Sequence, residues 1–230
     1  MIVGLVHPGE MGAAIGSAVS GHEVIWASDG RSDATRTRAA AFRDVGTLNA
    51  LAREADVILS VCPPHAALDV ASELAGFDGL YVDANAISPM HAQEIAQLQP
   101  RYVDGGIIGG PAGPRLYLSG EEATAVASLF VLETRIVANA SALKMAYAAW
   151  SKGTAAMLLA IEHVAQAHGV WDALAAEWDD ALLERLAAAH RSAEQKGWRW
   201  IGEMEEIADT FAAAGEPDGF HRAAAEVYRS

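Results

Sequence analysis

The sequence predicts an α/β domain with a parallel β-sheet over residues 1–138, followed by a smaller all-α domain over residues 139–230. Short β-branched runs alternate with Ala-rich helical stretches in the first part, and a glycine-rich loop follows the first run. After about Ser141 the strand-like runs stop, and apolar residues recur at helical spacing. Alternating strands and helices are typical of a parallel sheet with crossover helices.

Six segments of the first part have the length and composition of buried strands. They are short and rich in Val, Ile and Leu, and the stretches between them predict the crossover helices. The segments are residues 2–6, 23–27, 56–62, 80–83, 102–104 and 116–119.

The second part has the three- and four-residue apolar period of amphipathic helices. One such run is Leu174, Trp178, Leu182 and Leu186. We expect helix breaks at Gly169 and over residues 215–219, which contain Pro217. About ninety residues of helix that carry several tryptophans are hard to bury as a lone bundle, so we expect a homodimer through this domain, unless the tryptophans pack on the first domain alone. These tryptophans are Trp171, Trp178, Trp198 and Trp200.

Composition restricts the class of partner and the compartment. The 230 residues are 52% apolar and carry a formal net charge of −14, without clustered Lys and Arg, which disfavours a nucleic-acid partner. The single cysteine, Cys62, excludes an intramolecular disulfide, and no Cys/His group has metal-ligand spacing. No signal peptide is apparent, and the apolar stretch 142–167 holds too many charges for a membrane span. We therefore expect a cytoplasmic protein with a small-molecule substrate and no metal.

The loop that follows the first strand predicts a dinucleotide site. It reads His7-Pro8-Gly9-Glu10-Met11-Gly12, which is a GxGxxG pattern with histidine in place of the first glycine. Gly9 lets the backbone approach a pyrophosphate, and Gly12 lets the next helix pack on the strand. The N-terminus of that helix offers unpaired N–H groups to phosphate oxygens. The alternative is a glycine-rich turn without a ligand, whereas the ligand-binding interpretation gives a Rossmann-type domain.

The residues after the second strand favour NADP(H) over NAD(H). A strand that ends at position 27 leaves Ser28 to face the adenosine ribose, with Arg31 and Ser32 on the loop behind it. An arginine fork and two hydroxyls suit a 2′-phosphate. Asp29 is the counter-argument, because a shift of one residue would place its carboxylate at the ribose and favour NAD(H).

Several segments together resemble the β-hydroxyacid dehydrogenase superfamily, which contains 6-phosphogluconate and 3-hydroxyisobutyrate dehydrogenases. The similarity extends to a short 6-phosphogluconate dehydrogenase-like branch with a DUF1932-type C-terminal domain. It rests on the glycine loop, on the proline loop Cys62-Pro63-Pro64, on Lys144, and on two motifs at residues 83–89 and 104–110. The resemblance implies a hydride-transferring dehydrogenase or reductase, with the proline loop near the cofactor.

The resemblance also implies site residues. Lys144 corresponds to the catalytic lysine and would exchange a proton with the substrate. Asn85 stands where the family has a substrate-contacting serine, although it could instead cap the next helix. Gly109 and Gly110 would line the substrate pocket. Two family positions are changed, because Ile108 replaces the pocket serine and Ala148 replaces the asparagine one turn after the lysine.

The function expected from these residues is NADP-dependent hydride transfer to or from a small hydroxy acid, an alcohol or its carbonyl form, with the substrate between the domains. Two alternatives stay open. The loss of the pocket serine and asparagine favours reduction of a C=N bond, as in imine reductases. The changes at His7, Ile108 and Ala148 also suit a dinucleotide-binding sensor without turnover.

Overall fold

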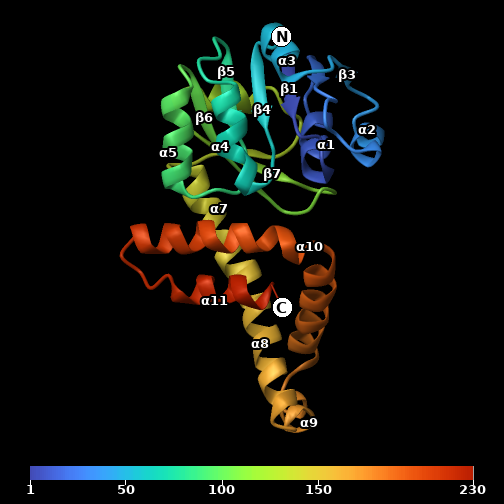
Figure 1. The fold of residues 1–230 in the computed structure, drawn as a ribbon, viewed down its shortest axis with the longest axis vertical. Coiled ribbons are helices and arrows are strands. Elements are labelled where there is room, and N and C mark those ends of the chain that lie inside the picture. Colours follow the sequence, from blue (N-terminus) through green and yellow to red (C-terminus); the bar gives the residue numbers. More distant parts are fainter. Residues whose placement is uncertain (230) are drawn as a thin grey trace. The chain divides into compact units, whose positions relative to one another are not determined.

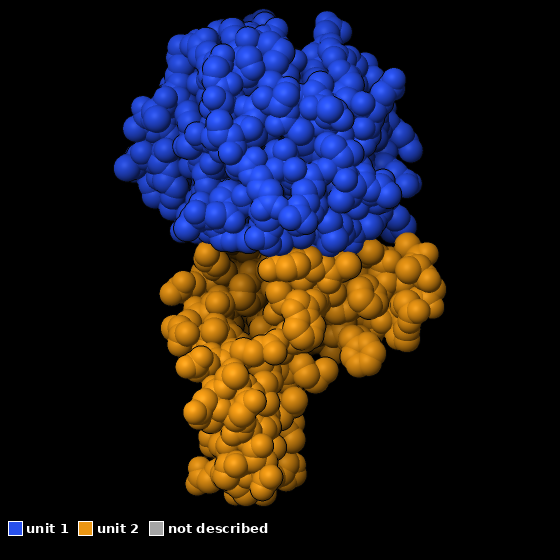
Figure 2. Space-filling view, turned by 180° about the vertical axis from the view of Figure 1, so that it is seen from behind, with its two compact units in different colours: residues 1–144 blue, residues 145–230 orange. Residues whose placement is uncertain are grey.

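The computed structural model describes residues 1–229 of the chain. They form two compact units, Met1–Lys144 and a second that begins at Met145 (Figure 2). The division falls inside helix α7 (Ala140–Ala148), a few residues beyond the boundary expected at 138/139. The first turns of this helix belong to unit 1 because the backbone N–H groups of Ala140 and Ser141 donate to the Asp104 carboxylate of the sheet.

Unit 1 is built on one sheet, which has the order β3-β2-β1-β4-β5-β6-β7-β8 over the described residues (Figure 1). Neighbouring strands from β3 to β6 are parallel, β7 runs antiparallel to β6, and β8 is parallel to β7. The strands are β1 Ile2–Val6, β2 Glu23–Trp26, β3 Arg43–Asp44, β4 Val57–Ser60, β5 Leu80–Asp83, β6 Tyr102–Ile108, β7 Arg115–Ser119 and β8 Thr134–Ile136. The predicted α/β fold class is therefore confirmed, and each of the six predicted strands is found.

Three features of the sheet differ from the sequence prediction. The edge strands β3 and β8 were not anticipated, since they are only two and three residues long. Strand β6 continues to Ile108, four residues past its predicted end at 104. The sheet is not wholly parallel, because the short connection over residues 109–114 can join β6 to β7 only as a hairpin.

Helices cover the sheet of unit 1 and bury apolar side chains on both of its faces. One core includes Leu5, Val82 and Leu116, and the other includes Ile58 and Tyr81. Alternate residues of a strand therefore enter opposite cores, as expected for a sheet that is buried on both faces. The helices are α1 Glu10–Ser17, α2 Asp33–Arg38, α3 Leu48–Glu54, α4 Pro64–Glu73, α5 Pro89–Leu98 and α6 Ala123–Ala127.

Unit 2 is helical throughout its described residues, as the apolar period predicts. A π-helical turn at Ala149–Gly153 joins α7 to the next helix. The further helices are α8 Thr154–Ala167, α9 Trp171–Ala176, α10 Asp180–Ala213 and α11 Gly219–Val227. The expected breaks are present, with Gly169 at φ +67° after α8 and residues 214–218 between α10 and α11.

One expected helical run is interrupted. The run that begins at Leu174 and passes through Trp178 is split between α9 and α10, because the Asp179 side chain accepts a hydrogen bond from the Leu182 N–H at 2.8 Å and caps α10. The Trp171 and Trp178 rings then pack edge to face, with centroids 5.7 Å apart.

Most tryptophans of unit 2 find partners within the unit. Besides the Trp171–Trp178 pair, Trp200 packs edge to face on Tyr228, with centroids 5.1 Å apart. Trp198 remains 64% exposed. Of the four tryptophans that led us to expect a dimer, only Trp198 therefore has a largely open side chain. No helix among residues 1–229 is long and apolar enough to cross a membrane.

Candidate functional site

The candidate site lies at the carboxyl ends of β1, β2 and β4. Strand β1 is paired with β2 on one side and with β4 on the other, so the chain order reverses at β1 (Figure 1). Open parallel sheets bind ligands outside the carboxyl ends of their strands at such a point. The loops that follow these three strands contain the glycine loop, the segment from Ser28 to Ser32, and the proline loop.

The glycine loop has the tight geometry that the sequence predicts. The His7 carbonyl accepts a hydrogen bond from the Gly9 N–H at 2.7 Å. A Cβ on Gly12 would lie 2.3 Å from the same carbonyl oxygen, so only glycine fits there. A Cβ on Gly9 would meet nothing within 4 Å, which leaves open space in front of the loop. This space is what a phosphate group at the loop requires.

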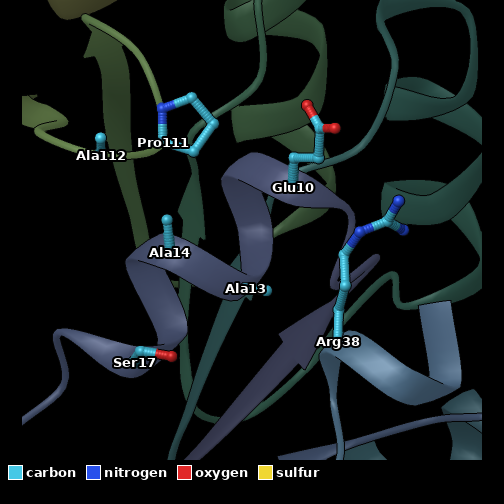
Figure 3. Close-up of a pocket in the computed structure, with 7 residues that line it drawn as sticks. All are labelled: Glu10, Ala13, Ala14, Ser17, Arg38, Pro111 and Ala112. Atoms are coloured by element: carbon cyan, nitrogen blue, oxygen red, sulfur yellow. The ribbon is translucent and has the colours of Figure 1, made fainter. Parts of the chain in front are cut away.

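Helix α1 begins at this loop without a side-chain cap. Its N-cap residue is Gly9, which supplies no side-chain cap, and the exposed Glu10 occupies its first turn. A hollow of about 590 Å³ lies beside the helix, and Figure 3 shows Pro111 and Ala112 of the β6–β7 loop across from Ala14. The β6–β7 loop and α1 therefore border one open space.

His7 and Arg31 present buried polar atoms without partners. The Nδ1 atom of His7 and the Nε atom of Arg31 are buried and have no hydrogen-bond partner among the described residues. Burial, together with the electrostatic effects of the Arg31 guanidinium and the neighbouring His65, lowers the pKa of His7 to about 4, so the imidazole is neutral at pH 7. Unpartnered buried donors are rare in native proteins and here fit a polar ligand.

The loop after β2 uses both of its serines for structure. The buried Ser28 donates its hydroxyl to the carboxylate of Asp44, the last residue of β3. Ser32 is the N-cap of α2 and accepts from the Thr35 N–H at 3.3 Å. Of the three residues expected at a 2′-phosphate, only Arg31 retains an unpartnered donor, while Asp29 is exposed. Sequence reasoning missed Asp44 because the two-residue strand β3 has no signal of its own.

Asn85 ties the loops after β4 and β5 together. Its Oδ1 accepts from the Cys62 N–H at 2.6 Å, and its Nδ2 donates to the Ser60 hydroxyl at 3.1 Å. It does not cap the following helix, because Ser88 does so by accepting from the His91 N–H. The amide is 2% exposed and fixes the backbone that leads into Pro63 and Pro64 at the start of α4.

Cys62 is a core residue of this loop. Burial raises the pKa of its thiol to about 12, and the sulfur lies 3.7 Å from the Ser60 hydroxyl. A thiol in this state is neither a nucleophile nor a metal ligand. No cluster of potential metal ligands is found among residues 1–229. Cys62 therefore borders the site through its backbone.

A row of polar side chains crosses the sheet near these loops. Ser60, Asp83, Asp104 and Ser119 occupy matching register positions on β4, β5, β6 and β7. Burial, helped by the charge of Asp104, raises the pKa of Asp83 to about 7. Polar residues at the ends of successive predicted strands are the signal that could have identified this row in the sequence.

Lys144 is held against β6. It lies one turn after the start of α7 and is half-buried. A Cβ on Gly106 would lie 2.7 Å from the Ala140 carbonyl oxygen and 3.0 Å from the Lys144 Cβ, so the helix approaches the strand at a glycine. Gly109 has φ +100° at the start of the β6–β7 loop, which Gly110 continues.

Three polar residues of the helical part, Lys152, His221 and Arg222, are engaged inside unit 2. Lys152 forms an ion pair with Glu203, in which both side chains are largely buried. His221 is 7% exposed, and its ring packs edge to face on Phe211. Arg222 pairs with Asp218 and Asp209. These contacts give all three residues a structural role in the helical unit.

Comparison with known proteins gives one domain match and one curated relative. Residues 165–230 match the domain of unknown function DUF1932. An uncharacterized 28.5 kDa protein of Methanothermus fervidus is 32% identical over 134 residues, which are 54% of this chain and 53% of that protein. The matched part therefore spans about half the length of the curated relative.

Solved structures share the fold over the whole chain. A conserved protein of unknown function, described as structurally similar to 3-hydroxyacid dehydrogenases, is 24% identical, with a TM-score of 0.71 over 100% of this chain and 97% of its own. A 3-hydroxyisobutyrate dehydrogenase from Salmonella typhimurium is 16% identical, with a TM-score of 0.70 over 100% and 93%. A protein solved with NADP+ is 18% identical, with a TM-score of 0.65 over 99% and 93%. An imine reductase from Streptomyces aurantiacus is 17% identical, with a TM-score of 0.55 over 100% and 93%.

Proposed function

Because the chain carries a DUF1932 domain and has the fold of the β-hydroxyacid dehydrogenase superfamily, we propose that it is a dinucleotide-dependent oxidoreductase that prefers NADP(H). Its reaction is hydride transfer between the nicotinamide and a small hydroxy acid or alcohol, or the corresponding carbonyl compound. The observation that carries the proposal is the glycine loop, where Gly12 packs on the His7 carbonyl and Gly9 faces open space at the carboxyl end of β1.

The residues that would hold the dinucleotide come from the three loops at this edge. The uncapped N-terminus of α1 offers N–H groups to the pyrophosphate, and the proline loop, fixed by Asn85, borders the same edge. When bound, the nicotinamide supplies the hydride chemistry. Lys144 exchanges the proton with the substrate oxygen, since it is half-buried and α7 holds it against β6. Gly110, where a Cβ would meet nothing within 4 Å, leaves room for substrate after the end of β6, and Gly109 gives the loop its positive φ.

The preference for NADP(H) rests on Arg31. The hydroxyls of Ser28 and Ser32 already have protein partners, so the guanidinium is the remaining donor for a 2′-phosphate. The Asp44 carboxylate, which accepts from the Ser28 hydroxyl, would repel the 2′-phosphate of NADP(H). The positive charge of Arg31 must outweigh this repulsion, so it is decisive for the choice between the two cofactors.

Reduction of a C=N bond is the second candidate. Its supporting observation is that Ile108 and Ala148 are 4% and 1% exposed, so the two positions where the superfamily has polar residues are apolar and buried. An imine needs fewer hydrogen-bond donors than a hydroxy acid. Turnover of a cyclic imine with no turnover of carbonyl compounds would select this reaction.

The first experiment titrates the protein with NADPH and NADH and follows tryptophan fluorescence. We expect NADPH to bind more tightly, and Arg31→Ala to remove that preference. Arg53→Ala is the matched control, because Arg53 is exposed and lies near the C-terminus of α3. That end of α3 leads into the amino end of β4, whereas the candidate site lies at the carboxyl ends of the strands. If neither nucleotide binds the wild type, the proposed function is wrong.

A second experiment tests catalysis with a panel of hydroxy acids, alcohols, ketones and imines. We expect Lys144→Met to lower kcat at least 100-fold without loss of dinucleotide binding, because general acid–base catalysis contributes about 10²–10⁴-fold. Lys196→Met removes a lysine of α10 and serves as the control. Binding without turnover on the whole panel would instead favour a sensor.

We also propose that unit 2 forms a homodimer. Its surface carries six large apolar side chains that are 49–66% exposed, an unusual number for a small helical unit. They are Trp150 at 61%, Met157 at 49%, Val164 at 61%, Val170 at 50%, Trp198 at 64% and Phe220 at 66%. Sedimentation at several protein concentrations tests this assembly, and a monomer at every concentration would contradict it.

A further inference from the structure

His7 is the one described non-glycine residue with a positive φ, which is +61°. Left-handed backbone is strained for a residue with a Cβ and costs about 1 kcal/mol or more, whereas glycine adopts it freely. Glycine is also the residue that the GxGxxG pattern has at this position. The chain thus keeps a histidine with a strained backbone at a position where glycine would form the same loop without strain.

The fold does not use the imidazole for hydrogen bonding. Its Nδ1 is buried without a partner, and so is the Nε of Arg31, whose charge is close enough to affect the His7 ring. The loops after β1 and β2 thus each present an unpartnered nitrogen, and the charge of Arg31 acts on the His7 ring. Backbone strain and unpartnered donors in one place are typical of a site that is completed by a ligand.

We propose that the His7 side chain is a binding contact of the dinucleotide site, where its imidazole donates a hydrogen bond to a pyrophosphate oxygen. This inference rests on the proposed function and deepens it. The pyrophosphate is the matching part of the cofactor, because His7 shares its tight turn with Gly9, which begins the uncapped helix α1. A neutral donor adds direction without charge, while the guanidinium of Arg31 supplies the charge.

The test compares His7→Gly with the wild type and with Arg31→Ala. Glycine fits φ +61° without strain, so His7→Gly should fold and should melt at the same temperature or higher. The Kd of His7→Gly should rise by about 10- to 100-fold, because a hydrogen bond to a charged group is lost. The increase should be the same for NADH and NADPH, since both cofactors contain the pyrophosphate. Arg31→Ala should weaken NADPH more than NADH.

The outcomes separate this inference from the proposed function. If the wild type binds both cofactors and His7→Gly binds them as tightly, the His7 contact is wrong and the oxidoreductase proposal stands. If His7→Gly weakens NADPH alone, the pyrophosphate assignment is overturned. If the wild type binds neither cofactor, both proposals fail together.

A second measurement titrates the wild type and needs the variant only to assign the His7 signals. The imidazole ¹⁵N resonances of His7, identified by their absence from His7→Gly, are followed while NADH is added. A hydrogen bond from a neutral ring to phosphate predicts a clear shift of the protonated nitrogen at pH 7. Resonances that stay unchanged at saturation would overturn the contact.

Discussion

The Asp104 carboxylate accepts hydrogen bonds from the backbone N–H groups of Ala140 and Ser141 with the same Oδ2 atom, each at 2.9 Å. Ser119 donates to this oxygen as well, also at 2.9 Å. One side chain of β6 thus fixes the N-terminus of α7, the helix that carries Lys144 one turn later. This connection makes the position of the proposed catalytic lysine depend on a residue of the sheet.

Asp104→Ala should therefore destabilise unit 1. The substitution leaves the Ser141 N–H and the Ser119 hydroxyl without this acceptor, while the Ala140 N–H keeps the Ser119 hydroxyl oxygen. Each unsatisfied donor costs about 1–3 kcal/mol, so we expect a loss of about 2–4 kcal/mol. Asp104→Asn keeps one acceptor and should cost less. Urea unfolding measures the change, and Asp78→Ala is the control because Asp78 is exposed. Equal stability of the two alanine variants would contradict the anchoring role.

Gly9 and Gly12 should respond differently to the same added methyl group. Gly12→Ala places a Cβ 2.3 Å from the His7 carbonyl, so the loop must move and the protein should lose several degrees of Tm. Gly9→Ala meets no protein atom within 4 Å and should leave Tm unchanged. It should still weaken dinucleotide binding about tenfold or more, because the methyl group occupies the space expected for a phosphate. Full binding by Gly9→Ala would argue against this use of the loop.

Asp83 should make stability fall as pH rises. Its pKa is raised to about 7 in the folded protein, above the value of 3.8 for an unperturbed aspartate. Between these pH values the folded state binds the extra proton, so the stabilising contribution is complete below pH 4 and is lost as pH rises through 7. The slope for one proton is at most about 1.4 kcal/mol per pH unit.

Asp83→Asn separates this effect from that of His7. The pKa of His7 is lowered to about 4, so His7 favours folding above its unfolded value of 6.5, and this contribution is lost as pH falls through 4. The two groups therefore oppose one another in the wild type. Chemical unfolding from pH 4 to 8 should show that Asp83→Asn gains stability with rising pH relative to the wild type. A constant difference between the two proteins would show that Asp83 does not titrate in this range.

Lys152 should be structural, in contrast to Lys144. Its ammonium pairs with Glu203 and lies 5.5 Å from the centre of the Trp200 ring. Lys152→Met leaves the Glu203 carboxylate buried without its cation and should cost about 3 kcal/mol. The double change Lys152→Met with Glu203→Leu should recover most of that loss, because an apolar pair can replace a buried ion pair. Calorimetry of the single and double variants measures the coupling, and a double variant no more stable than Lys152→Met would contradict it.

The sequence alone determined the fold class, the predicted strands, the helical second part and the glycine loop. These features follow from local rules, since the period of apolar side chains and the choice of turn residues act over a few positions. The contact of Gly12 with the His7 carbonyl is likewise local, because it joins residues five positions apart. The resemblance also placed Lys144 on a helix, which is where the structure has it. The terminal strand residue Asp83 was visible in the sequence, but its burial was not.

Only the tertiary structure decided how the polar residues are used. The hydroxyl of Ser28 is bound by Asp44, and the amide of Asn85 joins two loops, although both residues have the composition of ligand contacts. The short edge strands and the antiparallel β7 likewise depend on partners far away in the chain. Hydrogen bonds and burial between distant segments have no local period, so a side chain's partner becomes known only when the fold brings the segments together.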